Sequence, residues 1–144
     1  MYVSTIKNQS DIAALIYLFE NNWDLSTIDE LLHGLKYYTC ILCFNDKDAH
    51  ILPNAVIGYA FYSLDEQRNC IELTDIAVSK TALRTGVGTA LIKAIKEREQ
   101  KSIRLSVKTT NPAKLLYDKL GFKIIQEVDN YYAVGEDAYR MHLD

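Results

Sequence analysis

The chain has 144 residues, of which 49% are hydrophobic and 24% charged, and its formal net charge is −3. This length and composition suit one globular domain, and we expect a single domain over residues 1–144. The small acidic charge and the absence of a run of Lys and Arg argue against a nucleic-acid-binding surface. Without a long apolar stretch or a signal peptide after Met1, we expect a cytoplasmic protein that does not span a membrane.

The cysteines indicate reduced thiols. There are three of them, and an odd number without a secretory signal is typical of a reducing compartment. Cys40 and Cys43 have C-x-x-C spacing, but they lie in a strand-like run, which sends their side chains to opposite faces. The three histidines have no ligand spacing. We therefore predict neither a redox motif nor a metal site.

Hydrophobic periodicity predicts alternating strands and helices. Helices are expected at about residues 10–22, 27–35 and 111–121, with a further helix that opens at residue 86. Strands are expected at residues 2–7, 37–44, 55–64, 72–78, 102–108, 122–128 and 138–143. Residues 45–54 are predicted to join the second and third strands as an antiparallel pair. The predicted class is α+β: a mixed, mostly antiparallel sheet of six to seven strands, flanked by about four helices.

A glycine segment lies between the strand at 72–78 and the helix after it. It reads Leu83-Arg84-Thr85-Gly86-Val87-Gly88. Backbone N–H groups at a helix start that is open to a ligand suit phosphate oxygens. The alternative is that the glycines only shape a loop. A dinucleotide site fits poorly, because the third glycine is missing and no acid follows the next strand.

A second segment follows in Asn-x-x-x-x-x-Tyr form, from Asn111 through Tyr117 to Gly121-Phe122. The two segments in this order resemble GNAT-type N-acetyltransferases, which move an acetyl group from acetyl-CoA to an amine. The resemblance covers residues 55–128 by motif and implies one GNAT-like domain over the chain. There are two departures. Leu83 replaces the usual Gln or Arg, and Asn111 is one residue closer to Tyr117 than is common.

The resemblance implies a binding site for acetyl-CoA. The glycine loop would hold its pyrophosphate, and a bulged end of the strand at 72–78 would pair with the pantetheine arm. The cofactor-binding residues expected on this basis are Ile76, Ala77, Val78, Arg84, Thr85, Gly86, Val87, Gly88, Thr89 and Asn111. Asn111 also has a simpler role as a helix cap.

The reaction that the family carries out needs a base and an acid. Glu72 is the candidate base, because strict alternation places it with Thr74 and Ile76 on the face expected to meet the acyl group. Asp75 on the opposite face is the rival, and a β-bulge would exchange their exposures. Tyr117 is the candidate acid for the departing thiolate, although it also completes the apolar stripe of its helix.

A third, shorter segment concerns the acceptor. Asn130-Tyr131-Tyr132 followed by Glu136-Asp137-Ala138 is similar to the branch that acetylates protein N-termini, including those of ribosomal proteins. Tyr131 and Tyr132 are therefore expected to hold the peptide end. A small amine of the polyamine or aminoglycoside type is the alternative acceptor. A non-catalytic CoA-binding or partner-binding domain on the same fold is the alternative function. Nothing in the sequence predicts an oligomeric state.

Overall fold

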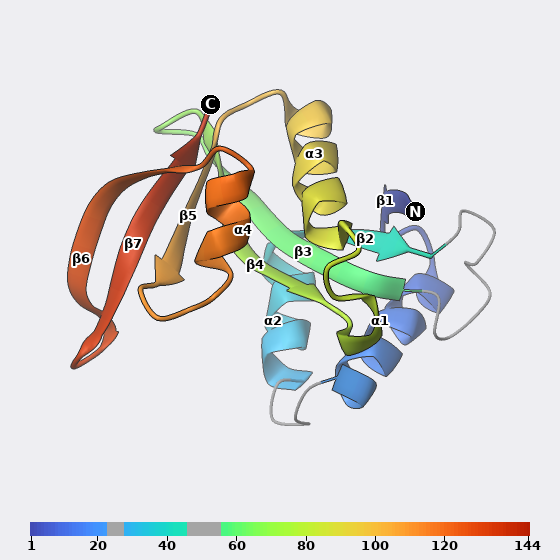
Figure 1. Cartoon of the computed structure of the whole chain (residues 1–144). Coiled ribbons are helices and arrows are strands. Elements are labelled where there is room, and N and C mark those ends of the chain that lie inside the picture. The colour runs from blue at the N-terminus through green and yellow to red at the C-terminus, as the bar shows by residue number, and fades with distance from the viewer. Residues whose placement is uncertain (23–27, 46–55) are drawn as a thin grey trace.

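Strands form the centre of the molecule. The computed structural model describes residues 1–22, 28–45 and 56–144. Within them a seven-stranded sheet has the order β1-β2-β3-β4-β5-β7-β6 (Figure 1). Neighbouring strands pair antiparallel except β4 and β5, which run parallel. The bounds are β1 (Tyr2–Thr5), β2 (Thr39–Phe44), β3 (Val56–Asp65), β4 (Cys70–Val78), β5 (Ile103–Lys108), β6 (Lys123–Ala133) and β7 (Glu136–Leu143).

Helices cover both faces of this sheet. On one face, α1 (Gln9–Asn22) and α2 (Ile28–Tyr37) bury residues such as Leu15 and Leu31 against β2 and β3. On the other, α3 (Val87–Glu99) and α4 (Lys114–Lys119) pack Leu91 and Tyr117 against the central strands. A short 3-10 helix (Lys80–Ala82) connects β4 to the loop before α3. The α+β class is confirmed.

Element types follow the periodicity better than element ends do. β6 runs to Ala133 rather than 128, and β7 begins at Glu136 rather than 138. α4 begins at Lys114, because residues 110–113 form turns first. The predicted loop at 45–54 falls mostly on residues 46–55, which lie outside the described residues. Cys40 and Cys43 lie buried in different cores, as alternation along β2 predicts. Among the described residues, no helix is long and apolar enough to cross a membrane.

A β-bulge interrupts β4. Its register against β3 pairs Leu73 with Tyr62 but Asp75 with Phe61, so Thr74 is the extra residue. As a result Leu73 and Ile76 pack into the same core, which strict alternation forbids. The expectation that Glu72 shares a face with Ile76 is therefore wrong. Glu72 and Asp75 both project from the α1–α2 side of the sheet.

β4 and β5 separate after Leu73 and Leu105, next to the bulge. Their pairing is confined to Ile71 with Ile103, Glu72 with Arg104, and Leu73 with Leu105. β4 then continues to Val78 and β5 to Lys108 without further pairing to each other. Within the described residues, no strand therefore pairs with the backbone groups of β4 that face β5 beyond the bulge, and these groups can accept another hydrogen-bonding partner.

Gly34 of α2 provides a test of how tightly α2 packs on the sheet. A Cβ at this position would lie 2.6 Å from Cε2 of the buried Phe61 ring. We expect Gly34→Ala to lower the free energy of unfolding by about 1–3 kcal/mol, because the ring has to move. Denaturant unfolding measures this. An increase in stability, as helix propensity alone predicts, would contradict the packing described here.

Candidate active site

The separation of β4 and β5 creates a hollow, which we call the strand gap, of about 370 Å³. Its walls come from both strands, from the turn before α4, from α4 and from β6. The lining residues are Thr74, Asp75, Ile76, Ser106, Val107, Lys108, Asn111, Ala113, Tyr117 and Tyr132. Residues from four separate parts of the chain therefore meet at one place beside the bulge.

A second hollow, the helix-start pocket, lies at the N-terminus of α3 and has a volume of about 740 Å³. Residues from Arg84 to Thr89 line it, apart from Thr85, and Lys119 of α4 contributes a second cation. The N–H of Ala90 donates to Gly86 O, so the N–H groups of the three residues before Ala90 have no acceptor within the helix. Free N–H groups, the helix dipole and two cations together suit phosphate oxygens.

The two glycines at the start of α3, Gly86 and Gly88, are required for different physical reasons. Gly86 has a φ of 89°, a left-handed conformation that strains other residues. A Cβ on Gly88 would lie 2.7 Å from Cδ2 of Leu116, so this glycine lets α3 approach the α4 side chain. Gly86 therefore shapes the turn into the helix, and Gly88 is required first by packing.

The structure places most of the remaining predicted cofactor residues around these hollows. Ile76 lines the strand gap and Val78 the helix-start pocket, whereas Ala77 packs towards α1 and α2. Thr85 lines neither hollow, and its hydroxyl donates to Ala82 O at 2.5 Å, which braces the loop. Asn111 lines the gap, and its side-chain oxygen accepts the Ala113 N–H at 2.9 Å. Asn111 thus caps the turn before α4 and also reaches the hollow.

Glu72 lies in an ion pair beside the strand gap. Its Oε1 is 3.4 Å from Nη1 of Arg140, which also donates to the Ser106 hydroxyl at 2.7 Å. Glu72 is not among the residues that line the gap, although Ser106 is. This geometry gives Glu72 a role in holding Arg140, which in turn holds Ser106.

Asp75 lies at the centre of the site. The hydroxyl of Tyr59 donates a hydrogen bond to Oδ2 of Asp75 at 2.6 Å. Although the residue retains exposed surface, desolvation of its carboxylate raises the pKa of Asp75, and the hydrogen bonds from Tyr59 and from the Ile76 backbone oppose this rise only in part. A carboxylate with a raised pKa at the edge of a hollow is suited to accept a proton.

Tyr117 combines a core position with access to the gap. Its side chain is 6% exposed, and its ring packs edge-on against Phe122 with centroids 5.5 Å apart. It also lines the strand gap together with Asp75. Burial, followed by the nearby Asp75 charge, raises the pKa of Tyr117 to about 12, so its hydroxyl is protonated at neutral pH. Both roles expected from the sequence are compatible with this position.

The two tyrosines of β6 differ in their position. Their rings are 4.8 Å apart, but only Tyr132 lines the strand gap. The hairpin that carries them is held by Asn130, whose N–H donates to Oδ1 of Asp137 at 2.8 Å and whose Oδ1 accepts the Gly135 N–H at 2.7 Å. Asn130 and Asp137 thus set the shape of the hairpin behind Tyr132.

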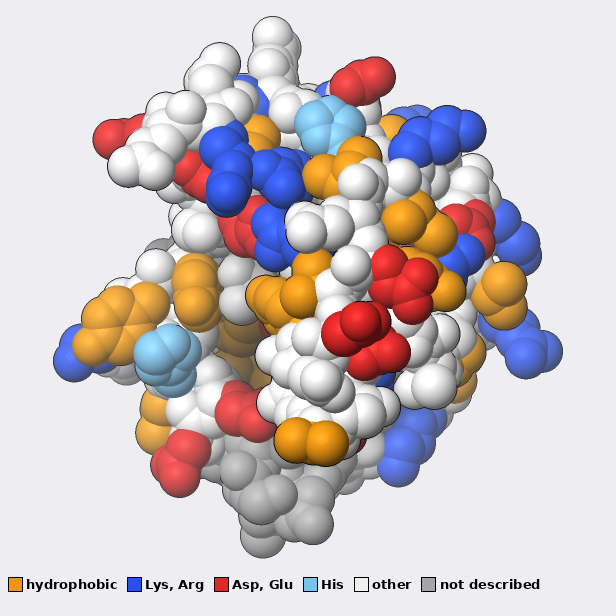
Figure 2. Space-filling model, turned by 90° about the vertical axis from the view of Figure 1, so that its left-hand side faces the viewer, with side chains coloured by type: hydrophobic (Ala, Val, Ile, Leu, Met, Phe, Trp, Pro, Cys, Tyr) orange, Lys and Arg blue, Asp and Glu red, His pale blue; other side chains and the backbone are white. Residues whose placement is uncertain are grey.

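A third hollow, the α2 pocket, has a volume of about 530 Å³ and lies between α2 and the bulge of β4. Figure 2 shows that this side of the molecule is hollowed, with hydrophobic side chains inside and acidic side chains at its lower edge. The lining residues are Asp29, Glu30, His33, Gly34, Tyr38, Phe61, Thr74 and Asp75. Thr74 and Asp75 also line the strand gap, so the two hollows meet at the bulge.

Sequence reasoning missed several of these lining residues. Thr74, Ser106, Lys108 and Lys119 face hollows that exist only once the strands separate and α4 docks. The acidic first turn of α2 was visible as a helix start, but nothing local connects it with β4. Tertiary packing alone brings these groups together.

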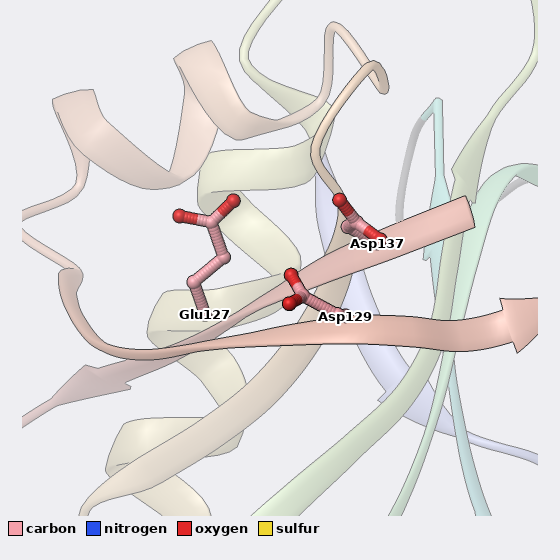
Figure 3. Close-up of side chains that lie close together, drawn as sticks. All are labelled: Glu127, Asp129 and Asp137. Carbon is pink, nitrogen blue, oxygen red and sulfur yellow. The ribbon is translucent and has the colours of Figure 1, made fainter. Parts of the chain in front are cut away.

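Three further carboxylates gather on the β6–β7 hairpin. Oxygen atoms of Glu127, Asp129 and Asp137 lie within 4.8 Å of one another, and Figure 3 shows them on the same side of the hairpin. Asp137 already accepts the Asn130 N–H, so part of this cluster belongs to the turn. Exposed acidic clusters of this kind need no ion, and the absence of a metal stays a prediction.

Comparison with known proteins assigns the chain to a family. A family model described as the acetyltransferase (GNAT) domain matches residues 37–124, more than half of the chain. An N-alpha-acetyltransferase of Saccharolobus solfataricus is 31% identical over 118 residues, which are 76% of this chain and 69% of that protein. One from Sulfurisphaera tokodaii is 39% identical over 101 residues, which are 64% of this chain and 59% of that protein, so the match spans about three fifths of that relative's length.

A solved structure of a putative acetyltransferase of the GNAT family from Desulfovibrio desulfuricans has the same fold. Its TM-score is 0.76 at 18% identity, and the match covers 99% of this chain and 98% of that one. The resemblance expected from the two sequence segments is thereby confirmed. The chain belongs to the GNAT acetyltransferase domain family.

Proposed function

We propose that the chain is an acetyl-CoA-dependent N-acetyltransferase whose acceptor is the N-terminal amine of a protein. One observation carries this proposal: the strand gap holds a carboxylate and a tyrosine hydroxyl, and it adjoins both a phosphate-type pocket and a separate α2 pocket. The two relatives named N-alpha-acetyltransferase support the choice of acceptor. A cytoplasmic location and the absence of nucleic-acid and membrane partners stay predictions from composition.

The hollows fit the cosubstrate. Acetyl-CoA supplies an acetyl group activated as a thioester. The start of α3, with Arg84 and Lys119 beside it, would hold the pyrophosphate. Asn111 and Ala113 line the strand gap while Pro112 lines the helix-start pocket, so the two hollows are neighbours across this turn. The edge of β4 that β5 leaves unpaired lies between the two hollows. It would hydrogen-bond the pantetheine arm in the way that β5 pairs with the first part of β4.

The catalytic roles follow from what each side chain can donate or accept. Asp75, directly or through a water, would take the proton that the acceptor nitrogen loses. Tyr117 would give its hydroxyl proton to the sulfur that leaves as the new C–N bond replaces the C–S bond. Tyr132 would contact the acceptor from the β6 side. We therefore prefer Asp75 to Glu72 as the base, because Glu72 is engaged with Arg140 outside the gap.

A small amine is the second candidate acceptor. The α2 pocket carries Asp29, Glu30 and Asp75, and a polyamine would also satisfy such a surface. A non-catalytic CoA-binding domain would need neither an acidic group nor a hydroxyl in the strand gap. Product analysis with both classes of acceptor separates these possibilities.

Gly86→Ala tests the cosubstrate site. The positive φ costs a non-glycine residue about 1–2 kcal/mol and distorts the helix start, so we expect acetyl-CoA binding to weaken about tenfold in calorimetric titration. Gly135→Ala is the matched control, because Gly135 has a φ of 80° in the hairpin away from this pocket. Equal loss of binding in both variants would reduce the effect to general destabilisation.

Asp75→Asn tests the base. We expect kcat to fall by about 10²-fold or more with little change in acetyl-CoA affinity, while Glu72→Gln causes a smaller loss. In the parent protein, kcat/KM should fall as the pH drops through the raised pKa of Asp75, because a protonated carboxyl cannot accept a proton.

Thermal unfolding provides the control for this variant. Because the pKa of Asp75 is raised in the folded state, the folded protein loses stability as the pH rises through that pKa and the carboxyl ionises. An Asn at this position carries no charge, so Asp75→Asn should not lower Tm at neutral pH. If Glu72→Gln abolished turnover while Asp75→Asn kept it, Glu72 would be the base, as the sequence suggested.

Tyr117→Phe tests the acid. The ring and its contact with Phe122 are retained, so Tm should change little while kcat falls about 10²-fold at saturating substrate. Unchanged kcat combined with a lower Tm would restrict Tyr117 to the core.

A further inference from the structure

The α2 pocket has a one-sided charge. Three carboxylates, of Asp29, Glu30 and Asp75, lie among its lining residues, and among the residues that the structure describes no Lys or Arg lines it. Of the described lining residues, His33 alone is basic, and its ring packs against Tyr37 with centroids 4.7 Å apart. The pocket is therefore a region of negative potential beside the point where the acceptor amine must lie.

Two of these carboxylates have no hydrogen-bond or ion-pair partner among the described residues. Within the described part of the chain, neither Asp29 nor Glu30 forms an ion pair or a side-chain hydrogen bond, and both residues are exposed. They stand in the first turn of α2, where acids also favour the helix dipole. Glu30 is near enough to Asp75 for its charge to contribute to the raised pKa of that group. Its field thus reaches the catalytic end of the pocket.

Aromatic side chains complete the pocket. Tyr38 and the buried Phe61 lie among the lining residues, and Gly34 lets the Phe61 ring pack directly against α2. Aromatic faces attract cations, and aliphatic stems of Lys and Arg pack well on them. An aromatic floor with acidic walls suits a long side chain that ends in a positive charge.

The α2 pocket adjoins the strand gap, in which the proposed reaction takes place. The α2 pocket and the strand gap share Thr74 and Asp75, and Tyr117 lies in the gap. Resting on the proposed function, we propose that the α2 pocket selects acceptors that carry a second positive charge close to the reactive amine, with Asp29 and Glu30 as specificity-determining residues. The second charge is either a Lys or Arg side chain near a peptide N-terminus or the distal amine of a polyamine.

Matched acceptors test the preference. Peptides that differ only in having Lys, Ala or Glu at each of the first two positions, together with spermidine, are compared at low and high salt. We expect a Lys peptide to have a KM roughly three- to tenfold lower than its Ala counterpart, a Glu peptide to be poorer, and the difference to shrink with salt. Greater kcat/KM for spermidine than for any peptide would assign the pocket to polyamines.

The double variant Asp29→Asn with Glu30→Gln tests the residues. It should raise KM for the Lys peptide to that of the Ala peptide and leave the Ala-peptide KM unchanged, while any change in kcat that follows from the altered pKa of Asp75 should be the same for both peptides. Glu97→Gln, an exposed acid on α3 at the other face of the sheet, is the control and should change nothing. Equal losses for Lys and Ala peptides would indicate a structural role for the two acids and overturn the inference.

Failure of the pocket inference and failure of the proposed function give different results. Acetylation of all peptides without a charge preference would overturn the pocket inference and leave the proposed function intact. Acetylation of no acceptor would overturn the proposed function, and equilibrium binding of the Lys and Glu peptides to CoA-saturated protein then decides the pocket. Equal affinity for the two peptides would refute the selection of cations.

Discussion

The site depends on one break in backbone pairing. β4 and β5 share three paired positions and then part, at the place where the Thr74 bulge shifts the register of β4 against β3. The break removes hydrogen bonds that a continuous sheet would keep, and it exposes a strand edge inside the molecule. The break opens the strand gap, and the bulge turns Asp75 towards the α2 side while Ile76 stays on the α3 side. The pockets on either side are positioned by this break.

The surrounding packing keeps the break in place. Buried residues of α3 hold the helix start against β4, and Tyr117 fixes α4 over the gap through its contact with Phe122. Tyr59 fixes the Asp75 carboxylate from β3, and Arg140, paired with Glu72, holds Ser106 at the opposite wall. Each reactive group is thus held by a specific neighbour, which is what preorganised chemistry requires.

Several features were predictable from sequence because their causes are local. The stripe of Leu91 and Ile95 identified α3, alternation placed Cys40 and Cys43 in different cores, and two short segments indicated the family. The bulge at Thr74 was not located, because it is a register shift between β3 and β4 that neither strand encodes alone. For the same reason Glu72 was preferred to Asp75. The α2 pocket was missed entirely, since Asp29 and Asp75 are brought together only by the fold.

The most direct test of the account is product mapping. Purified protein is incubated with acetyl-CoA and a peptide that contains both a free N-terminus and an internal Lys, and tandem mass spectrometry locates the acetyl group. The account predicts acetylation at the α-amine, with Asp75→Asn greatly slowing product formation. Acetylation confined to the Lys side chain or to small amines, or full product formation by the Asp75→Asn variant, would contradict it.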